Sequence, residues 1–259
     1  MMPAFDSLAQ SYDETFTYRQ LGIWLRELVR SHIPFQPGDS ILEIGCGTGE
    51  DALWMASQQL NVTATDASPA MLAQAQAKAA DTPIQWEILD INTLDNSLLM
   101  YQFDGVFSNF GAINCAENRP LLAQWLSQRV RLGGKLIFVV MNTICPWEIA
   151  YYLLKLKPAQ AFRRFKNGLT VYLDQTSTIR VWYPSPCRII QDFRPYFKHR
   201  RTVGIGTLLP PTYLDAQVSR YPKLFAYFKQ FDQRFGAVFP LTWLNDHYLI
   251  EFERCGHVS

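Results

Sequence analysis

The chain has 259 residues, 48% of them hydrophobic, and a formal net charge of +1 at neutral pH. This length fits one α/β domain with additions or two small domains, and the near-zero charge excludes a global field that attracts nucleic acid or an anionic membrane. No stretch approaches the ~18 apolar residues of a membrane-spanning helix, and early acidic residues argue against a signal peptide. The five cysteines are scattered without a Cys-x-x-Cys pair, which predicts neither a zinc site nor a disulfide framework and favours a reduced, cytoplasmic setting.

An amphipathic helix is expected near the start of the chain. Hydrophobic residues recur there with the i, i+3, i+4, i+7 spacing of a helix that buries one face, at Leu21, Trp24, Leu25 and Leu28. The segment before it, residues 5–13, reads Phe-Asp-Ser-Leu-Ala-Gln-Ser-Tyr-Asp and ends with Tyr12 and Asp13. The helix is expected to pack on the domain that follows.

A glycine loop follows the first predicted strand. Residues 41–49 read Ile-Leu-Glu-Ile-Gly-Cys-Gly-Thr-Gly, and a helix can begin at Glu50. Glycines at alternate positions permit unusual backbone angles, so a ligand can lie against the main chain at the carboxyl end of the strand. A dinucleotide site needs Gly-x-Gly-x-x-Gly, whereas Glu50 stands where that pattern requires glycine. Acidic residues at this place suit a ligand with positive charge better than a pyrophosphate.

The next two predicted strands each end at an acidic residue. Residues 62–66 end at Asp66, about twenty residues after the glycines, where a carboxylate can accept hydrogen bonds from both hydroxyls of a ribose. Ser68 and Pro69 predict the N-cap and first residue of the following helix. A third strand over residues 84–91 reaches its end near Asp90. The spacing of Asp66 therefore favours an adenosine-containing ligand, whether a dinucleotide or another.

Two further strands complete a repeating pattern. Residues 103–110 predict the fourth strand, with Asn109 at its carboxyl end, and residues 136–141 predict a fully buried fifth strand. The helix between them is expected to end at the glycine pair Gly133 and Gly134. Alternating strands and helices favour a doubly wound parallel sheet, in which the first and fourth strands flank the switch point that binds ligands.

The composition changes after residue 142. Residues 142–184 are rich in aromatic and basic residues and end in a predicted hairpin over 170–183. A helix from Ser185 leads to a sixth strand at 197–203, and a seventh is predicted at 247–253. Residues 206–242, between these two strands, form a second interruption rich in aromatic residues.

Four motifs make the chain resemble the class I S-adenosylmethionine-dependent methyltransferases that act on small molecules. The pattern Glu-x-Gly-x-Gly-x-Gly at 43–49 is the main one. The segments at 5–13, 66–72 (Asp-Ala-Ser-Pro-Ala-Met-Leu) and 103–106 (Phe-Asp-Gly-Val) are similar to others of that family. The resemblance covers nearly the whole chain and implies S-adenosylmethionine as the cofactor, whose sulfonium and amino groups are cationic.

The resemblance also implies an architecture. It predicts one Rossmann-like domain over residues 1–259, with a seven-stranded sheet in the order 3-2-1-4-5-7-6 and its last strand antiparallel. Residues 1–31 would form an N-terminal lid region over the cofactor. The interruptions at 142–184 and 206–242 would be substrate caps, and their aromatic residues suggest a small lipophilic or aromatic acceptor.

Family roles transfer to particular residues. Tyr12 would lie near the methionine end of the cofactor, Met71 would pack on the adenosine, and Asp90 would accept from the adenine amine while Ile91 covers the ring. The full set of cofactor-binding residues expected from the resemblance is Tyr12, Glu43, Gly45, Cys46, Gly47, Asp66, Ala67, Met71, Asp90, Ile91 and Asn109.

No catalytic residue and no metal ligand can be assigned from the sequence. Methyl transfer is an in-line displacement in which orientation supplies much of the rate, so a general base is optional. His199 and His247 could titrate near neutral pH, but each is expected to be an ordinary strand histidine far from the methyl group. Tyr151, Tyr152 and Glu148 lie in the expected cap, where they could meet the substrate.

Several alternatives stay open at this point. The chain could be a non-catalytic protein that binds S-adenosylmethionine, a nicotinamide-dependent dehydrogenase or an aminopropyl transferase. Nucleic acid is disfavoured as a substrate because Ser-Asn-Phe-Gly at 108–111 replaces the Asn-Pro-Pro-Tyr of adenine N-methyltransferases. The basic segment 155–166 could touch a membrane surface or an acidic carrier, but a solvated helix face is favoured. The acceptor atom and the oligomeric state are left open.

Overall fold

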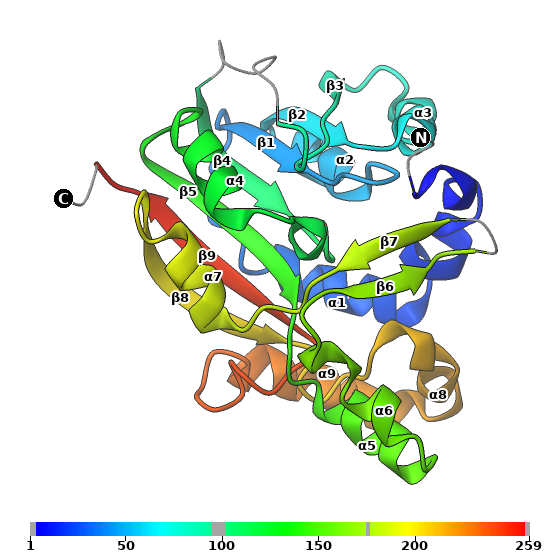
Figure 1. The fold of residues 1–259 in the computed structure, drawn as a ribbon. Coiled ribbons are helices and arrows are strands. Elements are labelled where there is room, and N and C mark those ends of the chain that lie inside the picture. The colour runs from blue at the N-terminus through cyan, green and yellow to red at the C-terminus, as the bar shows by residue number, and fades with distance from the viewer. Residues whose placement is uncertain (1–3, 95–101, 175–176, 257–259) are drawn as a thin grey trace.

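The computed structural model describes residues 4–94, 102–174 and 177–256. A seven-stranded sheet runs through the molecule in the order β3-β2-β1-β4-β5-β9-β8 (Figure 1). Its strands are β1 (Ser40–Ile44), β2 (Asn61–Asp66), β3 (Ile84–Ile88), β4 (Phe103–Ser108), β5 (Val130–Met141), β8 (Phe197–Ile205) and β9 (His247–Arg254). β1 to β5 are parallel, and β9 is antiparallel to both β5 and β8. The predicted order 3-2-1-4-5-7-6 is therefore confirmed, with β8 as the sixth sheet strand and β9 as the seventh.

Helices cover both faces of the sheet (Figure 1). One face carries α1 (Gln20–Arg30), α2 (Glu50–Ser57) and α3 (Pro69–Ala79), and the other carries α4 (Arg119–Ser127) and α7 (Pro186–Phe193). The inner stripe of α1 is buried as its spacing predicts, with Leu21, Leu25 and Leu28 at most 2% exposed. These two apolar layers form one core on each side of the sheet.

The end of α4 differs from the prediction. The helix stops at Ser127, and β5 begins at Val130, so Gly133 and Gly134 lie inside the strand and do not cap the helix. Val130 pairs with Phe103 of β4, and the register then shifts before β4 continues. A Cβ at Gly134 would lie 2.8 Å from the carbonyl oxygen of Asp104. The glycines therefore serve an irregular strand pairing, which the local sequence alone does not distinguish from a helix end.

The N-terminal segment and the two interruptions add the remaining elements. A 3-10 turn (Asp6–Leu8) and a π-helical turn (Asp13–Thr17) precede α1. The first interruption holds α5 (Pro146–Leu154), α6 (Pro158–Ala161) and the hairpin of β6 (Leu169–Tyr172) and β7 (Thr178–Val181); the second holds α8 (Asp215–Arg220) and α9 (Pro222–Phe235). Residues 1–3 and 175–176, which fall in the expected lid and first cap, lie outside the described residues.

The additions gather in two places (Figure 1). The β6–β7 hairpin extends from near the end of β5, in front of α1, toward the blue N-terminal segment, whereas α5, α6, α8 and α9 lie together at the lower end. α8 packs beside α1, where the Leu21 amide donates to the Asp215 carboxylate at 2.8 Å. Within the described residues, no helix is both long and apolar enough to cross a bilayer.

Candidate active site

The glycine loop after β1 has a backbone that only glycine adopts easily. Gly45, Gly47 and Gly49 all have positive φ, at 71°, 54° and 78°. A Cβ on Gly45 would lie 2.3 Å from the Cβ of Ala112, whereas the space where Gly47 would carry one is open. The loop thus presents bare main chain to that space, and α2 begins directly after it.

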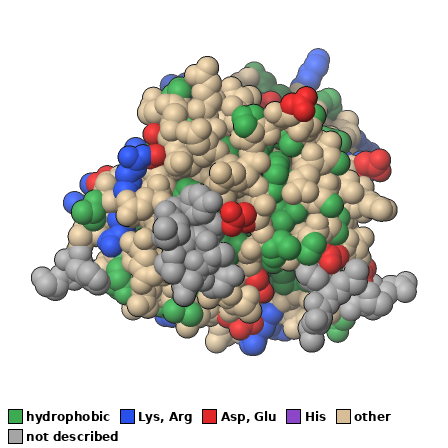
Figure 2. All heavy atoms as spheres, turned by 90° about the horizontal axis from the view of Figure 1, so that it is seen from above, with side chains coloured by type: hydrophobic (Ala, Val, Ile, Leu, Met, Phe, Trp, Pro, Cys, Tyr) green, Lys and Arg blue, Asp and Glu red, His purple; other side chains and the backbone are tan. Residues whose placement is uncertain are grey.

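A cavity of about 600 Å³ opens beside this loop. The glycine-loop half of the cavity contains many of the residues expected to bind the cofactor, namely Gly45, Gly47, Asp66, Ala67, Met71, Asp90, Ile91 and Asn109. The opposite half, which we call the hairpin half, is lined by apolar side chains of β6 and β7 and their turn, Val171, Leu173, Ile179 and Val181. Figure 2 looks down on the β3 edge of the sheet, where hydrophobic side chains run through the middle of the face beside several acidic ones.

Asp66 is held by the backbone at the edge of the cavity. Its two carboxylate oxygens accept from the amides of Gly47 and Ser68, each at 2.9 Å. Burial raises the pKa of Asp66, and these amide hydrogen bonds oppose the rise. Ser68 caps α3, as predicted, because its hydroxyl accepts from the Met71 amide. The turn after β2 therefore fixes both the carboxylate and the start of the helix.

A smaller cavity adjoins the first one and contains the remaining expected residues. It is lined by Glu43, Cys46 and Tyr12 together with Arg26, and Gly45, Gly47 and Asn109 line both cavities. Glu43 is buried, and its Oε2 atom has no hydrogen-bond partner among the described residues. Burial, reinforced by the nearby Asp51 carboxylate, raises the pKa of Glu43 well above its usual value.

Arg26 lines the smaller cavity although no sequence motif indicates it, and the same holds for Asp51. The Nε atom of Arg26 lies 3.1 Å from the Asp51 carboxylate, which also accepts from the Asn109 amide at 2.8 Å. Burial alone would raise the pKa of Asp51, but the guanidinium groups of Arg26 and Arg30 outweigh it and lower that pKa. Arg26 follows Leu25 and lies one turn before Arg30 on the buried side of α1. A basic residue next to the apolar stripe of the helix was the sequence feature that could have indicated its role.

Polar contacts hold the N-terminal segment against the glycine-loop half of the cavity. The Asp13 carboxylate pairs with Lys78 of α3 at 2.8 Å and accepts from the Thr48 hydroxyl of the glycine loop at 2.6 Å. Asp6 accepts from Ser68, and Ser7 donates to Asp174 beyond β6. Tyr12 lines both cavities, and burial raises the pKa of its phenol to about 12, so the hydroxyl stays protonated at neutral pH.

A row of aromatic rings connects this segment to the start of β9. Tyr12, Phe16, Phe110 and His247 follow one another with ring centroids 5.5 Å apart at each step. Phe110 lines both cavities with a positive φ of 45°, a strained backbone for a bulky residue. His247 is a strand residue, as expected, and its ring lies behind Phe110 without lining either cavity. The register of β9 places it there, because His247 pairs with Met141, another cavity residue.

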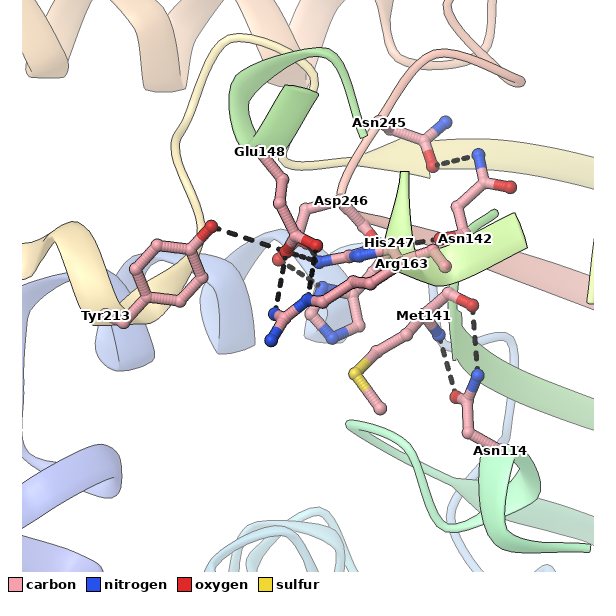
Figure 3. Close-up of polar contacts among 10 residues, drawn as sticks. Asn114, Met141, Asn142, Glu148, Arg163, Tyr213, Asn245, Asp246 and His247 are labelled. Atoms are coloured by element: carbon pink, nitrogen blue, oxygen red, sulfur yellow. Dashed lines mark hydrogen bonds and ion pairs between the residues drawn. The ribbon is translucent and has the colours of Figure 1, made fainter. Parts of the chain in front are cut away.

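A buried ionic network supports that corner (Figure 3). His247 Nδ1 lies 3.0 Å from the Asp246 carboxylate, which pairs with Arg164 at 2.7 Å. Arg164 and Arg163 both pair with Glu148 of α5, at 2.9 Å and 2.8 Å. These ion pairs therefore attach the first interruption to the start of β9.

The hairpin is joined to the sheet by one buried amide, which Figure 3 shows beside Met141. Asn114 donates to the carbonyls of Met141 and Trp182 at 3.0 Å and 2.7 Å, and accepts from the Met141 amide at 2.8 Å. Because Trp182 directly follows β7, this contact sets where the hairpin leaves the sheet edge.

Several candidates lie outside both cavities. Glu148 belongs to the ionic network, the rings of Tyr151 and Tyr152 meet edge to face with centroids 5.2 Å apart, and none of the three residues lines either cavity. The second interruption, 206–242, contributes no lining residue to either cavity. His199 bonds to Thr202 at 2.9 Å on β8 and lines neither cavity. No group of three His, Cys, Asp or Glu side chains suited to a metal ion occurs among the described residues.

Comparison with known proteins gives consistent matches along the chain. Residues 41–134 match a family model described as a methyltransferase domain. Demethylmenaquinone methyltransferase of Renibacterium salmoninarum is 31% identical over 186 residues, which cover 69% of this chain and 75% of that protein. The protein of the same name from Corynebacterium glutamicum is 26% identical over 195 residues, covering 73% of this chain and 80% of the relative.

Solved structures share the fold at lower identity. An S-adenosylmethionine-dependent methyltransferase from Mesorhizobium loti superposes with a TM-score of 0.59 and 18% identity over 89% of this chain and 98% of its own. Phosphoethanolamine N-methyltransferase 2 of Haemonchus contortus, solved with S-adenosylmethionine, has a TM-score of 0.61 and 15% identity over 97% of this chain and 57% of its own.

Proposed function

Because the chain belongs to the class I S-adenosylmethionine-dependent methyltransferases, we propose that it methylates a small lipophilic acceptor held in the hairpin half of the cavity. The enzyme class and the cofactor follow from that membership, which removes the nicotinamide dehydrogenase from the alternatives. The demethylmenaquinone named for the relatives is the first acceptor to test. When bound, the cofactor supplies a methyl group whose bond to sulfur breaks in line with the new bond to the acceptor.

The smaller cavity suits the amino-acid end of the cofactor. Glu43 has an unpartnered buried oxygen there, and Arg26 lies in the same wall. A carboxylate and a guanidinium side by side complement a group that carries both an ammonium and a carboxylate. We assign Glu43 to the amino group, Arg26 to the carboxylate, and Tyr12 to the contact that closes this end.

The glycine-loop half suits adenosine. Asp66 already accepts two amide hydrogen bonds, and the remaining acceptor capacity of its oxygens would take the ribose hydroxyls. Asp90 and Ile91 follow β3 at the same edge, where they would hold the adenine amine and cover the ring. Gly45 and Gly47 let the cofactor approach main chain, and Met71, Cys46, Ala67 and Asn109 complete the wall.

The apolar wall of the hairpin is the observation that carries the acceptor class. Val171, Ile179 and Val181 face the same cavity as the glycine loop, so a ligand held there would meet the methyl group without crossing solvent. Apolar walls with few polar groups are typical of sites for lipophilic small molecules. Within the expected cap 142–184, we assign this role to the hairpin.

The N-terminal region, residues 1–31, would act as the lid. Its contacts with Lys78, Thr48 and Ser68 cross the glycine-loop half, and Phe5 and Tyr12 line the cavity. Closure of this kind excludes water from a displacement reaction. We assign no general base, because orientation alone supplies roughly 7–11 kcal/mol in favourable intramolecular reactions.

The test has a binding arm and a transfer arm. Calorimetric titration should show micromolar binding of S-adenosylmethionine and none of NADH. Incubation with methyl-labelled cofactor should then label demethylmenaquinone with a short isoprenoid tail in preference to a hydrophilic catechol of similar ring size. Preferential labelling of the hydrophilic compound would contradict the lipophilic acceptor while leaving the family assignment intact.

A further inference from the structure

The α5–α6 tip, which we define as residues 153–166, exposes large apolar side chains. Leu154 is 86% exposed and Leu156 is 89% exposed, and Leu153, Phe162 and Phe165 are each about half exposed. The sequence favours a solvated helix face for the basic segment 155–166. In the structure it projects at the lower end of the molecule, away from the sheet (Figure 1).

The backbone itself turns Leu156 outward. The Leu156 amide donates to Leu153 at 2.9 Å and the Lys157 amide donates to Tyr152 at 2.9 Å, which is the pattern of a Schellman helix end. Leu156 occupies its left-handed position with φ of 55°, where glycine is favoured. A bulky, solvent-exposed leucine at a strained position contributes nothing evident to the fold, and strain of this kind is a pointer to function.

Charge on the tip is of one sign. Residues 149–173 contain five basic residues and no acidic one, namely Lys155, Lys157, Arg163, Arg164 and Lys166. Arg163 and Arg164 are paired with Glu148, and no ion pair of the three lysines occurs within the described part of the chain. The tip therefore carries uncompensated positive charge around its leucines, although the whole chain is nearly neutral.

Buried ion pairs attach the tip to the rest of the structure. Arg164 is buried and pairs with both Glu148 of α5 and Asp246 beside β9. The chain then continues from the tip into β6, whose Val171 lines the cavity. Only a short stretch of chain separates the tip from the cavity wall where the acceptor is expected, so a surface bound by the tip would lie near that wall.

We propose that the α5–α6 tip docks the enzyme on an anionic lipid bilayer, with Leu154 and Leu156 inserted among the lipids and the lysines at the headgroups. Exposed leucines flanked by lysines match the interfacial mode of membrane binding, and Phe162 and Phe165 suit the headgroup level. The inference rests on the proposed lipophilic acceptor, since docking would bring the cavity to a compound dissolved in the bilayer. It differs from nucleic-acid or acidic-protein binding because those partners would leave the leucines without an apolar environment.

The test is vesicle co-sedimentation of the full chain, without acceptor, on phosphatidylglycerol–phosphatidylcholine vesicles and on pure phosphatidylcholine. We expect binding to the anionic vesicles alone, weakened by salt because the lysine contribution is screened. Leu154→Ser should weaken vesicle binding roughly tenfold. Lys155→Gln and Lys157→Gln, made separately, should each weaken it roughly fivefold.

Leu156→Gly is the sharpest variant, because glycine suits the left-handed position. It should keep or raise the unfolding temperature while weakening vesicle binding roughly tenfold. Leu132→Ser is the matched control, since Leu132 is 71% exposed at the start of β5, far along the chain from the tip.

Three results would overturn the docking proposal. They are no sedimentation of the wild type with anionic vesicles at low salt, equal binding by Leu156→Gly and wild type, and an equal loss in Leu132→Ser. S-adenosylmethionine titration of the same samples separates this failure from that of the proposed function. If the protein binds the cofactor and methylates a lipophilic acceptor but does not bind vesicles, only the docking proposal is refuted.

Discussion

The glycine-loop half and the hairpin half of the cavity are built from different parts of the fold. In the glycine-loop half, Asp66 and the glycines sit where β1 and β2 end, and backbone amides hold the Asp66 carboxylate. The hairpin half comes from an insertion that is not part of the seven-stranded sheet, and a buried amide and a buried ionic network attach it.

The two halves of the cavity are therefore held in place by different interactions. Backbone hydrogen bonds at strand ends follow automatically from the parallel sheet, so they need few special side chains. An inserted hairpin needs its own attachment, and here that attachment uses charges whose burial is costly unless every partner is present. Loss of attachment should therefore harm stability, whereas loss of a glycine-loop contact should harm cofactor binding.

The largest expected effect is a loss of stability when the buried ionic network that attaches the first interruption is broken. Arg164→Met leaves Glu148 and Asp246 buried without their shared cation, and breaking such a pair costs about 3–5 kcal/mol of unfolding free energy. Arg163→Met is the control, because its side chain is 32% exposed and exposed pairs contribute about 1 kcal/mol or less. Urea unfolding measures both. Equal losses in the two variants would contradict the special role of the buried network.

The next effect is on the cofactor. Asp66→Ala should raise the dissociation constant for S-adenosylmethionine roughly 100-fold, about 2.7 kcal/mol, because it removes charge-assisted hydrogen bonds to the ribose. Asp90→Ala should cost only roughly tenfold, since one such bond is at stake. Calorimetric titration gives both values, and an Asp66 variant that binds as tightly as wild type would remove Asp66 from the site.

A smaller effect is expected in the hairpin half. Val171→Ser should raise KM for the lipophilic acceptor roughly tenfold with little change in kcat, because burial of a valine contributes uniform binding. The neighbouring Tyr172→Ser is the control, since Tyr172 is 76% exposed and does not line the cavity. Cofactor affinity should stay unchanged in both. A rise in KM shared by the two variants would point to a general disturbance of the hairpin.

The smallest expected effect is the release of a proton from Glu43 when the cofactor binds. Burial raises the pKa of Glu43 well above its usual value, so without cofactor it holds a proton to higher pH. The cationic amino group of S-adenosylmethionine favours the ionised form, so binding should release a proton and tighten a few-fold as pH rises. Titration in buffers of different ionisation enthalpy measures the release, and Glu43→Gln should abolish it.

Cofactor binding should tighten as pH rises, whereas the contribution of Glu43 to the stability of the cofactor-free protein should fall as pH rises. A carboxyl whose folded pKa is raised stabilises fully below its unfolded pKa, near 4.5, and this contribution is lost as pH rises through the folded value. Glu43→Gln should flatten that part of the pH profile. Proton release that persists in the variant would assign the linkage to another group.

The sequence was most informative where local chemistry and chain order coincide. The positive φ values of Gly45 and Gly47, the cap at Ser68 and the carboxylate of Asp66 all follow from motifs within a few residues. It was least informative where segments far apart meet. Arg26 enters the smaller cavity from α1, and the hairpin reaches the larger one from beyond β5.

By itself, the sequence indicated a doubly wound parallel sheet, because hydrophobic periodicity and the alternation of strands and helices are local or follow from chain order. The family, the cofactor and the strand order came from the resemblance of its short motifs to the methyltransferases, and these motifs are local too. Only the tertiary structure decided that His247 lies behind Phe110, that Gly133 and Gly134 belong to β5, and which interruption lines the cavity. Those outcomes depend on strand register and on packing between distant segments, which no local pattern encodes.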